Sequence, residues 1–527
     1  MVSFPTKHQD LSYSSSIVVF GTACIVMTAF LACNVVAIGI KRRRKSSVGQ
    51  RHPPASIITK IPTKPFDELR KKLTDANEEI LTEERQRICN LSFCQLLNEL
   101  QEGTVKPSDV LRAYQAKTLA SSEQSNCIAE FIEEAEMMAA ELDGATVKGA
   151  LHGLPISVKE NCTLPTSSWS LKATERPATV PEVLMALGAI PFCRTKSMYQ
   201  PMTLDQNANA VEYLQSRHNE TTRTQFATDS ALVGSGGSPL GVAGDLLGSA
   251  RLQALLNGCI AFKFTTNRVS NRGIFHQIKQ LPGCKSAPAL ISRDVDGIAE
   301  VAKQMFNNRL MKQRDNYCST QPLRIGYWTD ALEDKPERNA VVKAKEVLEE
   351  HGNELVPFAF KAFDEFGHIG CHSCIKPIAV NNPMKKSQSG PSLRKTPTLS
   401  TDTKANDHAP HLGKTIGTIN TTFEAMRFKL EVRRFFHEFC DEWRAAGLDA
   451  LICPPFPLQA EDFSTESAES IPHVAMANAF NLPAGLVPLA NAKENRPQNP
   501  PMGCSIVGLP YQDETVLRVM RELQAPE

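Results

Sequence analysis

The sequence has almost no net charge of either sign. Its 58 lysines and arginines are matched by 57 aspartates and glutamates over 527 residues, which leaves +1 at pH 7. This balance gives no reason to expect a nucleic-acid partner. The chain also lacks a regular cysteine framework, because its 15 cysteines are odd in number and irregularly spaced. Such usage argues against a disulfide scaffold and favours reduced, mostly buried thiols.

The sequence also lacks several motifs that are typical of particular enzyme or metal-binding families. There is no G-x-S-x-G elbow, which argues against an α/β-hydrolase, and the glycine-rich stretch fits neither a P-loop nor a dinucleotide fingerprint. The one short cluster of metal-ligand type is Cys371, His372 and Cys374 with His368 before it, and no second pair follows at a usual zinc spacing. We therefore expect neither a metal nor a cofactor.

The most distinctive N-terminal feature is an apolar run at residues 17–40 without a charged residue. At about 1.5 Å rise per residue, a helix of this length crosses a hydrocarbon core of about 30 Å. A cleaved signal peptide would carry its basic stretch before the apolar run, whereas here the basic cluster 41–45 follows it. The positive-inside rule then predicts a single-pass protein, with residues 1–16 extracytoplasmic or lumenal and the bulk cytoplasmic, at an endomembrane or the plasma membrane.

Beyond the apolar run, residues 41–64 are predicted to be a basic linker and residues 65–527 a single large domain. Residues 127–143 are rich in Ala, Glu and Met and are predicted to be helical. From residue 288 onward, helical patterns alternate with short strands, which indicates an α/β fold with a parallel or mixed sheet. Residues 380–415 have almost no apolar side chains, and we expect a mobile insertion there.

The segment LPISVKEN places a lysine at the end of a short apolar strand. Alternation puts Ile156 and Val158 on one face and Ser157 and Lys159 on the other. A lysine buried there would be costly unless it is paired or neutral, and a neutral amine can act as a general base. The alternative is a lysine whose amine reaches the surface.

A second segment, residues 231–251, is rich in glycine and small residues and reads ALVGSGGSPLGVAGDLLGSAR. Ser249 directly precedes an apolar, helical pattern. The free backbone N–H groups of a helix N-terminus can bind the oxyanion of a tetrahedral intermediate. Turn formation alone, or phosphate binding, would explain the glycines equally well.

Together these two segments resemble the amidase signature family, and within it the fatty acid amide hydrolases. The resemblance is carried by Ser157-Val158-Lys159-Glu160, by GSGGSPLG with the following Gly-Ser-x-Arg, and by the later stretches LDALICPPFP and NLPAGLVPLA. It implies a central, mixed, twisted β-sheet covered by helices on both faces. It also implies a homodimer and a membrane-bound serine hydrolase that cleaves amides or esters of long acyl chains.

By resemblance, the catalytic groups form a Ser-Ser-Lys triad in which Lys159 is the base and Ser249 the nucleophile. The same resemblance gives Asp245 and Arg251 the role of supporting the loop. The oxyanion donors would be the backbone N–H groups of Leu246, Leu247, Gly248 and Ser249.

The chain departs from the family pattern at three points of the site. Gln225 stands where the bridging serine belongs, and an amide relays a proton poorly compared with a hydroxyl. Leu247 replaces a glycine, and Gln253 replaces a proline. A shifted loop could supply the missing hydroxyl from Thr224, Thr228 or Ser230.

Three functions follow from this pattern. The first is a working membrane-anchored hydrolase of lipid amides. The second is a catalytically impaired protein that keeps the fold and binds lipid amides without efficient turnover. The third is a membrane scaffold that docks a partner through residues 380–415.

Overall fold

The computed structural model describes residues 63–74, 79–164, 177–196, 229–275, 285–306, 317–329, 336–363, 365–366, 422–454, 476–489 and 503–524. The predicted membrane run, Gln225, the His368–Cys374 cluster and the predicted insertion lie outside these ranges. Within the described ranges, no helix has both the length and the apolar character needed to cross a membrane. Residues Lys64–Glu527 form one compact unit.

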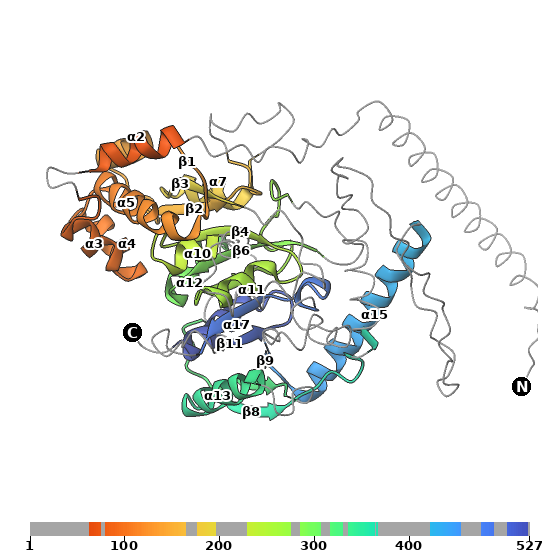
Figure 1. The fold of residues 1–527 in the computed structure, drawn as a ribbon. Helices are drawn as coiled ribbons and strands as arrows, with labels where there is room; N and C mark the ends of the chain where they lie inside the picture. The colour runs from red at the N-terminus through yellow and green to blue at the C-terminus, as the bar shows by residue number, and fades with distance from the viewer. Residues whose placement is uncertain are drawn as a thin grey trace, which may run out of the picture. The chain divides into compact units, whose positions relative to one another are not determined.

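An eleven-stranded mixed β-sheet organises this unit, with the strand order β1-β3-β2-β4-β6-β5-β10-β11-β9-β7-β8 (Figure 1). Strand β2 is parallel to both of its neighbours, β3 and β4, whereas β4 and β5 are each antiparallel to β6. The strands are β1 (Ile128–Phe131), β2 (Pro155–Lys159), β3 (Ile190–Thr195), β4 (Gly241–Asp245), β5 (Ile260–Lys263), β6 (Ala287–Ser292), β7 (Arg324–Tyr327), β8 (Glu354–Pro357), β9 (Ala450–Cys453), β10 (Ala484–Pro488) and β11 (Gly503–Val507).

Alternate residues of the central strands enter different hydrophobic cores, so the sheet is covered on both faces. Val242 of β4 and Phe262 of β5 belong to the large core. Their neighbours Ala243 and Ala261 belong to a small, alanine-rich core on the opposite face. This alternation follows from the two-residue repeat of a strand, and it confirms the predicted α/β sheet buried on both faces.

The helices divide between these two faces. On the large-core face lie α12 (Val295–Met305), α17 (Asp513–Leu523) and the N-terminal helices α3 (Glu83–Asn90), α4 (Phe93–Glu102) and α5 (Pro107–Ser125). On the small-core face, α10 (Asp229–Gly234) and α11 (Ser249–Leu256) pack against β4 and β6. The remaining helices are α2 (Thr63–Leu73), α6 (Ala135–Asp143), α7 (Thr179–Ala186), α13 (Pro336–Glu350) and α15 (Thr422–Ala446).

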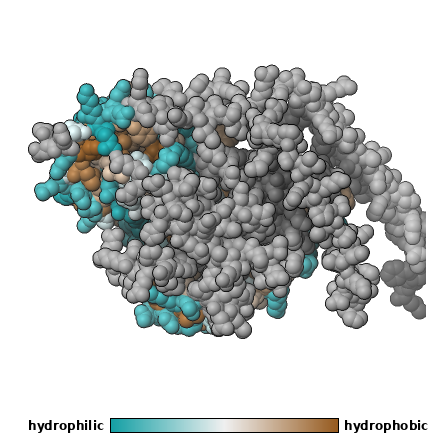
Figure 2. All heavy atoms as spheres, in the orientation of Figure 1, coloured by the Kyte–Doolittle hydropathy of each residue, from teal (hydrophilic) through white to brown (hydrophobic). Residues whose placement is uncertain are grey.

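The surface in Figure 2 shows hydrophobic residues among hydrophilic ones over the N-terminal helices. There Leu69, Ile80 and Leu81 are only partly buried against a small cluster around Leu73. The helices at this end therefore leave some apolar side chains at the surface.

The helix predicted over residues 127–143 is wrong in its first part. Asn126, directly after α5, has a left-handed conformation, and residues Ile128–Phe131 then form β1 at the edge of the sheet. This strand pairs with β3, with Phe131 opposite Cys193, and helix begins only at Ala135. Pairing with β3 therefore overrides the helical composition of the segment.

The cysteines of the described ranges behave as predicted from their spacing. Ten are free thiols, and all of them are buried except Cys94 and Cys318. Burial raises the pKa of the Cys162 thiol to about 12 and that of Cys259 to about 12. Among the described residues, no group of three or more His, Cys, Asp or Glu side chains could hold a metal.

Candidate active site

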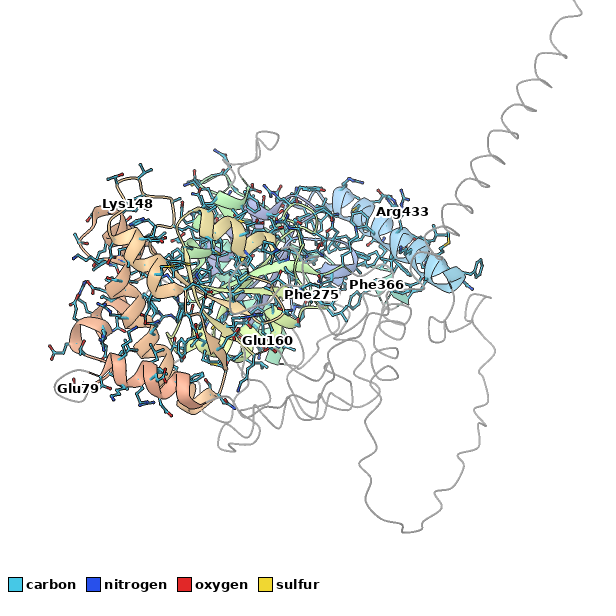
Figure 3. The ribbon with its side chains drawn as sticks, turned by 90° about the horizontal axis from the view of Figure 1, so that it is seen from above. Glu79, Lys148, Glu160, Phe275, Phe366 and Arg433 are labelled. Carbon is cyan, nitrogen blue, oxygen red and sulfur yellow. The ribbon has the colours of Figure 1, made fainter. Side chains whose placement is uncertain are left out.

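The predicted base ends one strand, and the predicted nucleophile begins the helix that follows the neighbouring parallel strand. Lys159 is the last residue of β2, and β4 runs parallel to it with Val158 opposite Val242. In Figure 3, Glu160 marks the position just beyond the end of β2. Because β2 and β4 are parallel, the loops that follow them leave the same edge of the sheet. Ser249 begins α11 directly after the loop that follows β4.

Lys159 is buried, with 5% of its surface exposed. Its position agrees with the predicted alternation, since Ile156 and Val158 enter the large core and Lys159 faces α10 and α11. The amine lies 3.4 Å from the Asp229 carboxylate and donates a hydrogen bond of 3.2 Å to the Gln253 side-chain oxygen. The lysine is therefore paired, and its amine does not reach the surface.

Ser249 lies at the N-terminus of α11 and is partly exposed. Its hydroxyl accepts a long hydrogen bond of 3.4 Å from the Leu246 N–H. The serine is thus held on the turn between a strand and a helix while it keeps access to solvent.

Two residues before Ser249 have the left-handed backbone conformation. Gly248 has φ 85°, which glycine adopts without strain, but Leu247 has φ 57°, where a side chain costs on the order of 1 kcal/mol. The Leu247 side chain packs against the aromatic cluster that contains Trp328 and Phe358. That packing offsets the backbone strain and holds a bulky residue two positions before Ser249.

Asp245 and Arg251, the residues predicted to support this loop, contact each other, and Asp245 contacts the loop. The Asp245 carboxylate accepts hydrogen bonds from the Gly248 N–H at 3.0 Å and from Arg251 at 3.1 and 3.3 Å. Arg251 also donates to Asn478 at 3.0 Å, and Asn478 donates to the Asp245 carbonyl at 3.1 Å. Burial alone would raise the pKa of Asp245, but the Arg251 guanidinium and these hydrogen bonds outweigh it and lower the pKa.

The four predicted oxyanion donors differ in how they are used. The Gly248 N–H donates to Asp245, and the Ser249 N–H donates to the Leu246 carbonyl at 3.2 Å. The Leu246 N–H donates to the Ser249 hydroxyl. The Leu247 N–H has no acceptor among the described residues.

Of the residues considered as a substitute for the bridging serine, only Ser230 lies within the described ranges. Its hydroxyl accepts a hydrogen bond of 3.4 Å from the side chain of Asn257, the residue that follows α11. At about 1.5 Å rise per residue, Asn257 is on the order of 12 Å from Ser249 along the helix axis. Ser230 is thus at the wrong end of α11 to relay a proton to Ser249.

Sequence reasoning missed Asp229 and Asn478. One feature of the sequence could have indicated Asp229: it lies two residues before the small-residue block 231–251, and it is buried in the structure. No feature of the sequence could have indicated Asn478, because it contacts Arg251 from a position 227 residues later in the chain.

The family model described as Amidase matches residues 109–517. The chain belongs to the amidase family. It is therefore, by family, an amidase-type hydrolase, and its amidase fold is the predicted mixed α/β sheet.

Curated relatives of this amidase-family chain include two fatty acid amide hydrolases. Fatty acid amide hydrolase 1 of Caenorhabditis elegans is 25% identical over 87% of this chain and 92% of its own length. The Sus scrofa fatty-acid amide hydrolase 1 is 23% identical over 82% of this chain and 85% of its own. The vitamin D3 hydroxylase-associated protein of Gallus gallus is 29% identical, over 52% of this chain and 63% of its own length.

Solved amidase structures share this fold. A fatty acid amide hydrolase structure superposes with a TM-score of 0.61 at 18% identity, covering 88% of this chain and 92% of that one. The peptide amidase of Stenotrophomonas maltophilia gives a TM-score of 0.58 at 17% identity, covering 82% of this chain and 96% of that one.

Proposed function

We propose that this protein is a membrane-anchored serine hydrolase that cleaves acyl amides, with Ser249 as nucleophile and Lys159 as the base. One observation carries the proposal: Ser249 lies at the start of α11, and Lys159 ends the neighbouring parallel strand, on the same sheet edge. A nucleophile at a helix N-terminus beside a buried amine is suited to acyl transfer.

In this mechanism the Ser249 oxygen attacks the amide carbonyl, and its proton passes to Lys159. The Leu247 N–H is the donor best placed for the oxyanion, since it has no other acceptor among the described residues. Lys159 then gives its proton to the leaving nitrogen as the C–N bond breaks. Water hydrolyses the resulting acyl ester and restores Ser249.

The reaction would be slow, because the hydroxyl that should connect base and nucleophile is replaced by Gln225. Loss of one member of such a triad costs on the order of 10³ to 10⁶ in rate. The substrate class, long-chain acyl amides, is inferred from the names of the relatives and from the apolar run at residues 17–40. A single-pass anchor there, with the hydrolase domain cytoplasmic, would let the site take lipid from the bilayer. The homodimer implied by the resemblance stays a prediction.

A fluorophosphonate probe tests this proposal directly, because it reacts only with an activated serine. The full chain in detergent should be labelled slowly at Ser249, and the Ser249→Ala protein should not be labelled. A fatty acid amide hydrolase labelled in parallel controls for the probe. If that enzyme reacts and this protein does not at any pH from 6 to 10, the hydrolase proposal is wrong.

A second function, binding of lipid amides without efficient turnover, is favoured by the contacts of Lys159. An amine held by Asp229 and Gln253 is suited to a structural role. In that case long-chain acyl amides should bind to the parent and to Ser249→Ala protein with equal affinity and leave unchanged. Mass spectrometry of lipids that co-purify with each protein measures this, and acyl-chain products would contradict it.

A further inference from the structure

Two basic side chains meet at the loop that follows α10. Lys117 comes from α5, and Arg293 directly follows β6. A methyl group placed on Gly236 would lie 3.5 Å from Lys117 Cε and 3.5 Å from Arg293 Nη1. These two atoms are therefore separated by no more than twice that distance. Like charges this close repel each other unless a negative charge lies near both of them.

Neither side chain has an acidic partner among the described residues. Lys117 forms no ion pair or hydrogen bond through its amine within the described ranges. Arg293 makes one long hydrogen bond of 3.5 Å, to the Cys89 carbonyl. The neighbouring Asp294 carboxylate accepts instead from the Asp296 N–H at 2.8 Å and caps α12. Most of the N–H donors of Lys117 and Arg293 are therefore left for a ligand or for water.

Hydrogen bonds fix the loop at which the two side chains meet. Gly236 has the left-handed φ of 78°, which glycine adopts without strain. The Thr118 hydroxyl, next to Lys117 in α5, donates to the Gly237 carbonyl at 2.7 Å. The Gly237 N–H donates to the Leu232 carbonyl at 2.9 Å. The backbone is thus already ordered, and an anion could bind here without ordering the loop.

A buried hydroxyl without a partner lies near the same place. Tyr114 is three residues before Lys117, so the two lie on one face of α5. It is completely buried, and its hydroxyl has no hydrogen-bond partner among the described residues. Burial raises the pKa of Tyr114, with a smaller contribution from Cys89, and the nearby Arg293 guanidinium counteracts part of that rise. Tyr114 is therefore a third donor close to the two cations.

This cluster lies at the opposite edge of the sheet from the active site. β4 begins at Gly241, which is opposite Ile291 of the antiparallel strand β6. The loop before β4 and Arg293 after β6 therefore lie at one edge of the sheet. Ser249 follows the other end of β4. An anion bound at the cluster would leave Ser249 free.

We propose that Lys117 and Arg293, with the loop at Gly236, form a binding site for a phosphate-type oxyanion, either free phosphate or a phosphate ester. A guanidinium binds two oxygens of such a group at once, and an ammonium adds a second positive charge. Two cations without an acidic partner favour a dianion over a singly charged carboxylate. Binding removes the repulsion between the two side chains and stabilises the folded protein.

Thermal unfolding of the full chain in an uncharged detergent tests the site. Inorganic phosphate and glycerol 3-phosphate are each compared with sodium chloride at equal ionic strength, since chloride controls for general screening. Each phosphate compound at millimolar concentration should raise the unfolding temperature of the parent by about 2 °C. A larger shift with glycerol 3-phosphate indicates a phosphate ester as the ligand, and equal shifts indicate free phosphate.

Three substitutions separate binding from general effects of charge. Lys117→Met and Arg293→Met each remove one cation, and each should abolish most of the shift. Lys117→Glu places a carboxylate beside Arg293. It should therefore unfold at a higher temperature than Lys117→Met in chloride, and it should not respond to phosphate.

The same changes at Arg112 are the matched control. Arg112 is an exposed arginine of α5 that pairs with Asp109 at 3.5 Å. Arg112→Met and Arg112→Glu should keep the phosphate shift of the parent. If phosphate stabilises the parent no more than chloride does, or if the Lys117 and Arg293 variants shift as much as the parent, the proposal is overturned. This result does not depend on whether Ser249 is labelled, so the hydrolase proposal is tested separately.

Discussion

At Leu247 the backbone conformation favours glycine, whereas the packing of the side chain favours leucine. Its left-handed backbone favours glycine, and its side chain packs against the aromatic cluster around Trp328. Replacement by glycine relieves on the order of 1 kcal/mol of strain and loses a comparable amount of packing.

We therefore predict that Leu247→Gly changes the free energy of unfolding by less than about 1 kcal/mol. The fluorophosphonate probe should label Ser249 faster in this variant than in the parent, because removal of the leucine side chain opens the approach to the loop. Leu246→Gly is the matched control, since Leu246 is 6% exposed and its φ is not positive. That control should lose about 2 to 5 kcal/mol, as buried leucine truncations do. Chemical unfolding and probe labelling measure both, and equal losses in the two variants would contradict the account of Leu247.

Lys263 is the buried residue with the clearest consequence for pH dependence. Burial, with a smaller effect of Arg251, lowers the pKa of Lys263 from 10.5 to about 7. A neutral amine has two N–H donors, and Lys263 donates to the Phe264 and Leu482 carbonyls at 3.1 and 2.7 Å. The folded pKa lies below the unfolded one, so between pH 7 and 10.5 the unfolded state binds more protons and stability rises with pH.

Replacing Lys263 by Met should remove that rise. The unfolding temperature of Lys263→Met relative to the parent should be highest near pH 6 and should fall as the pH increases to 9. Lys148→Met is the control, because the Lys148 amine also donates to two backbone carbonyls, at 2.9 and 2.7 Å, but is partly exposed (Figure 3). If the difference in unfolding temperature between Lys263→Met and the parent does not change across this pH range, the Lys263 amine of the parent stays charged when buried.

At the scale of elements, the β4–α11 turn depends on a buried ion pair that holds strand and helix together. Asp245 ends β4 and is completely buried, and Arg251 in α11 is 2% exposed. We predict that Arg251→Met costs about 3 to 5 kcal/mol, because the Asp245 carboxylate is left without its cation. Arg251→Met with Asp245→Asn should cost less than Arg251→Met alone in chemical unfolding. A larger loss in the double variant would mean that the carboxylate is held by other donors.

The same elements show what sequence alone could predict. The alternation of β2 placed Lys159 opposite the large core, since a strand buried on both faces has only two ways to present its side chains. The serine turn was predicted because glycines and a helical pattern meet at one point. The partners of these residues were not predicted, because Asp229 and Asn478 are brought in by packing between distant segments.

The error at residues 127–143 has the same origin. The composition of this segment is helical, and only the edge of β3 makes Ile128–Phe131 a strand. Whether a segment becomes an edge strand depends on whether the rest of the fold leaves a neighbouring strand edge unpaired. The local sequence pattern does not contain that information.

At the scale of the whole molecule, the proposed activity depends on two parts of the sequence, the proposed membrane anchor and the amidase domain. The residues proposed to carry out hydrolysis belong to the compact unit Lys64–Glu527, whereas the proposed anchor precedes this unit in the sequence. If the anchor only delivers the domain to lipid, chemistry at Ser249 and access to membrane substrate should be separable.

Deletion of residues 1–62 is therefore predicted to release the protein from membranes washed with carbonate and to leave the rate of Ser249 labelling unchanged. Turnover of a long-chain acyl amide presented in vesicles should fall, whereas turnover of a short, soluble acyl amide should not. Replacing residues 17–40 by another uncharged apolar run of equal length is the control, and it should restore both membrane binding and turnover in vesicles. If the deleted protein instead stays on membranes, the remaining domain binds lipid by itself and the anchor is not what delivers the substrate.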